Sequence, residues 1–185
     1  MEEKRERQKK RIFSQKSISI RVFVAEMGEI RTAIGEMSMS SNPSNETIIS
    51  LLEQAKTIAV VGLSDKPDRT SYQIAEAMQQ AGYRIIPVNP NLRGPVLGET
   101  SYATLQEIPD TIDIVNIFRR SDSVPPVIDE VVQMSSKPKA VWMQLGIAHD
   151  EAAKRALDHG IEFVIMDRCI KVDHAVLLKG KKRNS

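Results

Sequence analysis

From residue 46 onward, short apolar runs alternate with segments whose apolar residues recur every three or four positions. The runs are six or seven residues long and rich in Ile and Val, as expected for strands buried on both faces of a parallel sheet. Five strands are predicted on this basis: Thr57–Gly62, Tyr83–Val88, Ile112–Phe118, Lys139–Gln144 and Ile161–Met166.

The segments between these runs show helical periodicity. Ser71–Ala81 places its apolar residues on one face, and Gly82 is a suitable stop signal. Strands that alternate with helices indicate a parallel sheet with right-handed crossovers. The predicted fold class is therefore α/β, a three-layer Rossmann-like domain with a five-stranded parallel sheet. The other predicted helices are Glu46–Ala55 with Asn45 as its N-cap, Val124–Met134 and His149–His159, with a short helix or turn over Ser101–Ile108.

The segment before residue 41 does not continue this pattern. It begins with a run of mixed charge and holds one candidate strand, Ile18–Val24. It lacks the apolar stretch of a signal peptide, and its early glutamates do not fit a mitochondrial transit peptide. We therefore expect 1–40 to be a mostly irregular extension, disordered or accessory. A folded domain over 41–178 and a basic tail over 179–185 are expected to follow it.

Charge is unevenly distributed along the 185 residues. Residues 1–40 hold nine basic and six acidic side chains, and 179–185 hold four basic ones. The remainder, 41–178, has thirteen basic and eighteen acidic side chains, so the basic excess lies at the ends. Nucleic acid is therefore not an expected partner of the folded part.

Composition narrows the class of protein further. With 41% hydrophobic and 27% charged residues the chain fits a soluble globular protein, and its apolar runs are far shorter than the ~20 residues of a membrane span. The single cysteine excludes an intramolecular disulfide and suits a reducing compartment, so a cytoplasmic location is predicted. The three histidines have no metal-ligand spacing, and no metal site is predicted.

Parallel sheets of this kind bind ligands beyond the carboxyl ends of their strands, so the loops there are the candidate sites. The first loop, Gly62–Ser71, lacks the G-x-G-x-x-G pattern of a dinucleotide fold. It offers hydroxyl and cationic side chains just before a helix start, which suit a phosphate or pyrophosphate. A solvated loop in which Thr70 or Ser71 caps the helix is the alternative. The side chains concerned are those of Ser64, Lys66, Arg69, Thr70 and Ser71.

The end of the second strand argues against NAD. After Val88 the chain continues with Asn89 and Pro90. No acid follows before Glu99, whereas NAD binding expects one at this point to hold the ribose 2′-hydroxyl. Asn89 can both donate and accept hydrogen bonds to a ligand, and a simple turn before Pro90 is the alternative.

The end of the third strand carries two cations. Phe118 is followed by Arg119 and Arg120, whose guanidinium groups match phosphate oxygens in charge and geometry. Surface pairing of these arginines with Asp122 or Glu130 is the alternative.

The last two strand ends add an amide and a thiol. Gln144 and Gly146 follow the fourth strand, and Arg168 and Cys169 follow the fifth. A lone cysteine is usually a small buried hydrophobe. Beside Arg168 at a ligand site, Cys169 could instead be a reactive thiolate.

Taken together, these segments resemble a known family, the small stand-alone CoA-binding domain proteins of bacteria. That family is similar to the N-terminal CoA-binding domain of the succinyl-CoA synthetase α subunit. The resemblance covers about 45–178 and follows every strand end in order. It rests on the segments IAVVGLSDKPDRTSYQIAEAMQQAGYRIIPVNP, VLGETSYATLQEIP, IDIVNIFRRSDSVPPVIDEVV and AVWMQLGIAHDEAAKRALDHGIEFVIMDRCI.

The resemblance implies that the domain holds coenzyme A. CoA carries a pyrophosphate and a 3′-phosphate, which agrees with cationic loops and with the absence of a ribose-binding acid. The residues expected to bind it lie in all five strand-end loops. They are Gly62, Ser64, Lys66, Arg69, Thr70, Ser71, Val88, Asn89, Pro90, Phe118, Arg119, Arg120, Gln144, Gly146 and Cys169.

The chain departs from the synthetase in one respect. We expect it to lack the following domain with the phosphorylated histidine, and His174 lies in no matching motif. The resemblance therefore implies a module that binds CoA or an acyl-CoA without ligase chemistry. The alternative is an NAD(P)-linked or thiol-redox enzyme acting through Cys169. A protein partner or a homo-oligomer is left open by the sequence.

Overall fold

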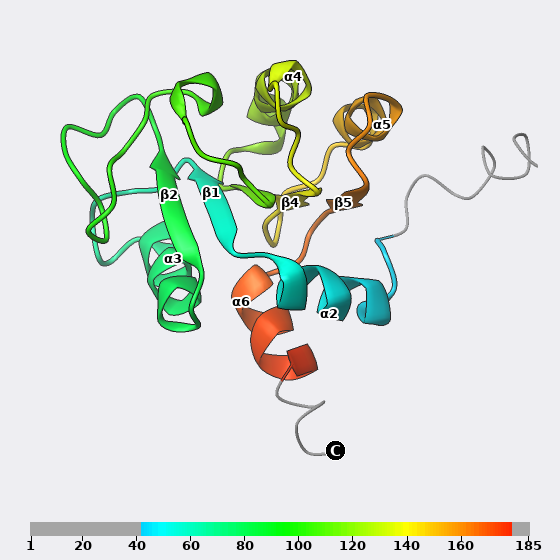
Figure 1. Cartoon of the computed structure of the whole chain (residues 1–185), viewed down its shortest axis with the longest axis horizontal. Coiled ribbons are helices and arrows are strands. Elements are labelled where there is room, and N and C mark those ends of the chain that lie inside the picture. Colours follow the sequence, from blue (N-terminus) through cyan, green and yellow to red (C-terminus); the bar gives the residue numbers. More distant parts are fainter. Residues whose placement is uncertain (1–41, 179–185) are drawn as a thin grey trace, which may run out of the picture. The chain divides into compact units, whose positions relative to one another are not determined.

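In the computed structural model, residues 42–178 are described, and they form an α/β domain around a single sheet (Figure 1). All five strands are parallel, in the spatial order β2-β1-β3-β4-β5. The five-stranded parallel sheet predicted from the apolar runs is thus confirmed, and the expectations for 1–40 and 179–185 lie outside the described residues. The strands are β1 Thr57–Val61, β2 Arg84–Val88, β3 Ile114–Ile117, β4 Ala140–Met143 and β5 Phe163–Ile165.

Each strand is shorter than the apolar run that predicted it, and side chains beside the strands hold the preceding loops in place. Oδ2 of Asp113 accepts hydrogen bonds from the backbone N–H groups of Lys56 and Thr57, at 2.8 and 2.9 Å. Tyr83 donates its hydroxyl to the carbonyl of Leu52 at 2.7 Å. Both contacts fix the loops before β1, β2 and β3 at the amino edge of the sheet.

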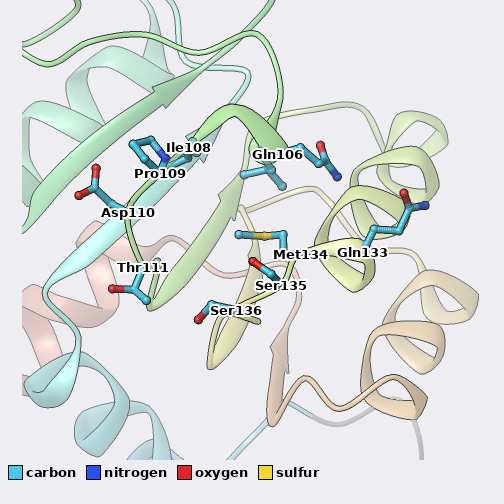
Figure 2. Close-up of a pocket in the computed structure, with 10 residues that line it drawn as sticks. Gln106, Ile108, Pro109, Asp110, Thr111, Gln133, Met134, Ser135 and Ser136 are labelled. Carbon is cyan, nitrogen blue, oxygen red and sulfur yellow. The ribbon is translucent and has the colours of Figure 1, made fainter.

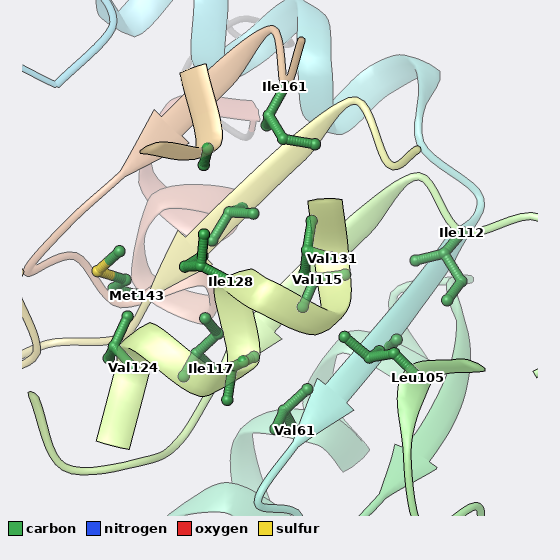
Figure 3. Close-up of a cluster of buried hydrophobic side chains, with 14 of the residues drawn as sticks. Val61, Leu105, Ile112, Val115, Ile117, Val124, Ile128, Val131, Met143 and Ile161 are labelled. Atoms are coloured by element: carbon green, nitrogen blue, oxygen red, sulfur yellow. The ribbon is translucent and has the colours of Figure 1, made fainter. Parts of the chain in front are cut away.

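Helices cover both faces of the sheet, as expected of three layers (Figure 1). One core lies between the sheet and α4 and α5 (Figure 3), and the other lies between the sheet and α2, α3 and α6. The helices are α2 Asn45–Gln54, α3 Thr70–Gln80, α4 Val124–Gln133, α5 Asp150–Asp158 and α6 Ile170–Asp173. Shorter helical segments are η1 Leu105–Glu107, η2 Ser121–Ser123 and the π-helical η3 His174–Leu178.

Two local expectations were wrong in detail. Ser44 caps α2, because its Oγ accepts from the N–H of Thr47 at 3.2 Å, and Asn45 is already helical. The helix or turn predicted over Ser101–Ile108 is limited to η1. After β5 the chain forms two further helical segments, α6 and η3, for which the sequence pattern gave no bounds.

The strand order reverses beside β1, and this reversal positions the site. β1 pairs with β2 on one edge and with β3 on the other. The loop after β1 leads to α3 on one face, whereas the loop after β3 leads to α4 on the opposite face. Ligands of such sheets bind where neighbouring loops diverge in this way. Within residues 42–178 no helix is long and apolar enough to cross a membrane.

Candidate functional site

Three strand ends meet at Gly62. Its backbone N–H donates to the carbonyl of Val88 at 2.8 Å, which joins the ends of β1 and β2. Its φ is 88°, and a Cβ at this position would lie 2.4 Å from the carbonyl oxygen of Phe118. Only glycine allows this close approach of β1 and β3 without a backbone shift. The predicted residues Gly62, Val88 and Phe118 are therefore neighbours.

Asn89 connects the same three loops through its side chain. Its Nδ2 donates to the carbonyl of Leu63 at 2.9 Å, and its Oδ1 accepts from Nη2 of Arg119 at 3.3 Å. Oδ1 also accepts from the N–H of Asn91 at 3.2 Å, so Asn89 forms the expected turn as well. Arg119 is half-buried, and this contact holds its guanidinium group over the switch point.

The start of α3 has no side-chain cap. Arg69 occupies the N-cap position without a capping hydrogen bond. Ser71 accepts instead from the N–H of Ser64 at 3.1 Å, and Ser64 accepts from the N–H of Lys66 at 3.2 Å. The alternative in which Thr70 or Ser71 caps the helix is thus wrong. Hydroxyls shape the loop, and the start of α3, the positive end of its dipole, has no capping side chain among residues 42–178.

The cations of these loops differ in their surroundings. Lys66 and Arg69 are exposed and form no ion pair with any residue of 42–178, although Asp65 and Asp68 lie in the same loop. Arg120 is 88% exposed and pairs with Asp122 at 3.2 Å, which agrees with the surface-pairing alternative. Arg119 is the cation that the fold turns toward the other strand ends.

The ends of β4 and β5 are tied to each other. Oδ1 of Asp167 accepts from the N–H of Gly146 at 2.6 Å, and Nε1 of Trp142 donates to the carbonyl of Arg168 at 2.7 Å. Asp167 has a φ of 53°, a left-handed conformation that the Gly146 contact helps to hold. These bonds place Gln144, Gly146 and the segment before Cys169 along one edge.

Arg168 does not act as a free cation beside Cys169. Its Nε and Nη2 donate to both carboxylate oxygens of Asp173, at 2.7 and 2.9 Å, and this ion pair raises the pKa of Arg168. Cys169 is half-buried, precedes α6, and packs against the core on the α2, α3 and α6 side. The contact with the core agrees with the reading of Cys169 as a small buried hydrophobe, and a reactive thiolate stays a prediction.

Two candidate residues were missed by sequence reasoning. Asn116 lies inside β3, is 1% exposed, and accepts from Nε2 of Gln144 at 2.9 Å. An amide within the apolar run Ile112–Phe118 was the available signal. Arg93 is exposed in the loop after β2, where it lines an open depression of about 530 Å³ together with Leu92, Gly94, Pro95, Thr100 and Ser101.

A second hollow lies away from the strand carboxyl ends. It has a volume of about 300 Å³ and lies between η1 and the end of α4 (Figure 2). Its lining includes Gln106, Asp110, Met134 and Ser136, and none of the predicted site residues. No group of three or more potential metal ligands occurs in the described part of the chain.

Fold and loops together define a Rossmann-like α/β domain with its candidate site at the switch point of the sheet. Residues 56–175 match the family model of a CoA binding domain, and the chain belongs to this family. The family resemblance read from the strand ends is thereby confirmed.

Relatives of two kinds share this domain. The Bacillus subtilis protein named "Uncharacterized protein YneT" is 48% identical over 135 residues, which cover 73% of this chain and 97% of that protein. An ADP-forming acetate–CoA ligase II of Archaeoglobus fulgidus is 31% identical over 157 residues, covering 76% of this chain but only 22% of the ligase. Similarity to the ligase is thus confined to a minor part of that enzyme.

Solved structures give the same picture. A Thermus thermophilus protein, cell-free ID.343, superposes with a TM-score of 0.69 at 34% identity, covering 73% of this chain and 99% of that one. A hypothetical protein of Pyrococcus horikoshii superposes with a TM-score of 0.68 at 31% identity, covering 74% and 93%.

Proposed function

We propose that this protein binds coenzyme A or an acyl-CoA across the carboxyl ends of its strands. The observation that carries the proposal is the convergence of Gly62, Asn89 and Arg119 beside the uncapped start of α3. Such a site offers a close backbone approach, a fixed cation and a helix dipole to one anionic group. Membership of the CoA binding domain family names the ligand that would supply that group.

The pyrophosphate of CoA is proposed to lie at the start of α3. A helix N-terminus stabilises a phosphate through its dipole and free amides. Arg119 would add a charge-assisted hydrogen bond, and the exposed Lys66 and Arg69 would add charge from the loop.

The 3′-phosphate is proposed to lie over the loop after β2, near Arg93. This cation is exposed beside an open depression and forms no ion pair with any residue of 42–178. The first acid after β2, Glu99, is held by Arg84 at 3.4 Å. A phosphate here would meet a cation and no free carboxylate, whereas an unphosphorylated NAD ribose would find no acid.

The proposed role is binding without ligase chemistry. Two of the histidines serve the fold of α5: Nδ1 of His149 accepts from the N–H of Ala152 at 3.2 Å, and the ring of His159 bonds to the carbonyl of Arg155 at 2.8 Å. The ring of His174 packs edge-on against Tyr83, with the ring centroids 5.6 Å apart. His149 is the last residue of the loop between β4 and α5, where its ring caps the helix, and His159 and His174 lie outside the loops at the carboxyl ends of the strands.

Thermal unfolding in the presence of CoA or NAD tests the proposal. A ligand at 100 times its Kd adds about 2.7 kcal/mol to the free energy of unfolding, so CoA should raise Tm. Native mass spectrometry of the same samples gives the stoichiometry. A larger rise in Tm with NAD than with CoA would overturn the proposal.

A further inference from the structure

A buried pair of side-chain amides lies at the ends of β3 and β4. Asn116 and Gln144 are 1% and 3% exposed, and Nε2 of Gln144 donates to Oδ1 of Asn116 at 2.9 Å. Oε1 of Gln144 is also buried, yet it accepts no hydrogen bond from residues 42–178.

This oxygen is exceptional in the described part of the chain. The one other buried side-chain oxygen there without a hydrogen bond, Oδ1 of Asp129, forms an ion pair with Arg155 at 2.9 Å. A buried acceptor without a donor lowers the stability of the fold, and native proteins normally satisfy such groups with a side chain, water or a ligand. Oε1 of Gln144 therefore needs a hydrogen-bond donor from outside the described residues.

The position of Gln144 restricts where that donor can come from. Side chains alternate along a strand, and Trp142, two residues earlier, packs in the core on the α2, α3 and α6 side. Gln144 thus lies on the same side as Cys169, which packs against that core as well. β4 is two strands away from β1, which is about 10 Å at the usual strand spacing.

We propose that Gln144 is a specificity-determining residue for the pantetheine arm of CoA, with Asn116 as the residue that orients it. The inference rests on the proposed function and assigns a part of the ligand to this end of the site. Oε1 can only accept a hydrogen bond, so phosphate oxygens cannot satisfy it. The pantetheine arm carries amide N–H groups, and with the phosphates at β1 the proposal requires that the arm lead toward β4 and β5.

The test compares two ligands on one variant. Adenosine 3′,5′-bisphosphate carries the nucleotide half of CoA but no pantetheine arm. In Gln144→Met we expect CoA to bind about tenfold more weakly, which corresponds to about 1.4 kcal/mol, and the bisphosphate to bind as in the wild type. Gln106→Met, a change of the same kind at the hollow by η1, is the matched control and should alter neither affinity.

A second variant separates ligand recognition from a structural role. Replacing both amides, as in Asn116→Leu with Gln144→Met, removes the orphan acceptor together with its partner, so Tm without ligand should be unchanged or higher. CoA affinity should still fall. Unchanged CoA affinity in both variants overturns the inference, as does an equal loss for CoA and the bisphosphate with a lower Tm. Failure of the wild type to bind either ligand overturns the proposed function as well.

Discussion

Replacing Arg119 by Gln should weaken CoA binding while leaving the domain folded. The side chain is half-buried, and its Nη2 lies 3.3 Å from Oδ1 of Asn89. Its Nε lies 3.3 Å from the position that a Cβ at Gly62 would take, so the guanidinium group is held beside the end of β1. Gln preserves part of the packing and removes the charge.

The size of the effect follows from the kind of bond that is lost. A hydrogen bond to a charged group contributes about 1.5–3 kcal/mol, so the Kd for CoA should rise about 10- to 150-fold. The fold loses one side-chain contact, about 1 kcal/mol, because Asn89 keeps its bonds to Leu63 and Asn91. Isothermal titration calorimetry at two salt concentrations would measure both the loss and its electrostatic origin.

Two other arginine variants serve as controls for Arg119→Gln. Arg120→Gln should have a smaller effect, below about fivefold, because this side chain is 88% exposed and its pair with Asp122 is a surface ion pair. Arg155→Gln, which breaks the ion pair between Arg155 on α5 and Asp129 on α4, should leave CoA affinity unchanged. Equal affinities in the wild type and Arg119→Gln, or equal losses in all three variants, would refute the reasoning.

Three further outcomes are expected. Gly62→Ala should lower Tm more than Gly98→Ala, since both positions have positive φ but only the first brings a Cβ to 2.4 Å from the carbonyl oxygen of Phe118; similar Tm values would show that β3 shifts freely. Burial raises the pKa of Tyr83 to about 12, above its usual 10, so its contribution to stability should be complete below pH 10 and decline between pH 10 and 12. Denaturant unfolding would give the free energy of unfolding of the wild type and of Tyr83→Phe at each pH. The two values should converge as the pH rises from 10 to 12, and a constant difference between them would contradict the assignment. A chain beginning at Met39 should fold and bind CoA as the full chain does, and a clearly lower Tm would show that 1–38 supports the domain.

Much of this fold could be predicted because its strands are buried on both faces. A strand of that kind reads as an unbroken apolar run, and all five runs became strands of one sheet. Strand ends were predicted less well, because they depend on contacts between distant segments. The hydrogen bonds from Lys56 and Thr57 to Asp113 join positions more than fifty residues apart, and no local sequence pattern predicts them.

The candidate site was predictable in part for a related reason. Parallel strands bring their carboxyl ends to one edge, so topology alone gathers Gly62, Asn89 and Arg119. Sequence could not rank the two adjacent arginines, since only the fold turns Arg119 toward Asn89 and leaves Arg120 at the surface. Asn116 was not predicted as a site residue, because a single amide in an apolar run does not show which side chain it contacts on the neighbouring strand.

The last prediction concerns the only cysteine of the chain. Cys169 is half-buried at the end of β5, on the same side of the sheet as Gln144. Because Arg168 is engaged by Asp173, reaction at Cys169 must depend on how closely a bound ligand approaches it. If the pantetheine arm leads from β1 toward β5, its sulfur ends near this thiol. We therefore expect CoA disulfide to modify Cys169 faster than glutathione disulfide does.

The exchange itself needs no further oxidant. The thiolate of Cys169 attacks one sulfur of CoA disulfide, a protein–CoA mixed disulfide forms, and one CoA thiolate leaves. Mass spectrometry should detect a single CoA adduct in the wild type and none in Cys169→Ser, because the chain has no other cysteine. Adenosine 3′,5′-bisphosphate should slow the reaction by occupying the nucleotide half of the site. If both disulfides react at the same rate, or if the bisphosphate has no effect, Cys169 is merely an accessible thiol and the arm does not end beside it.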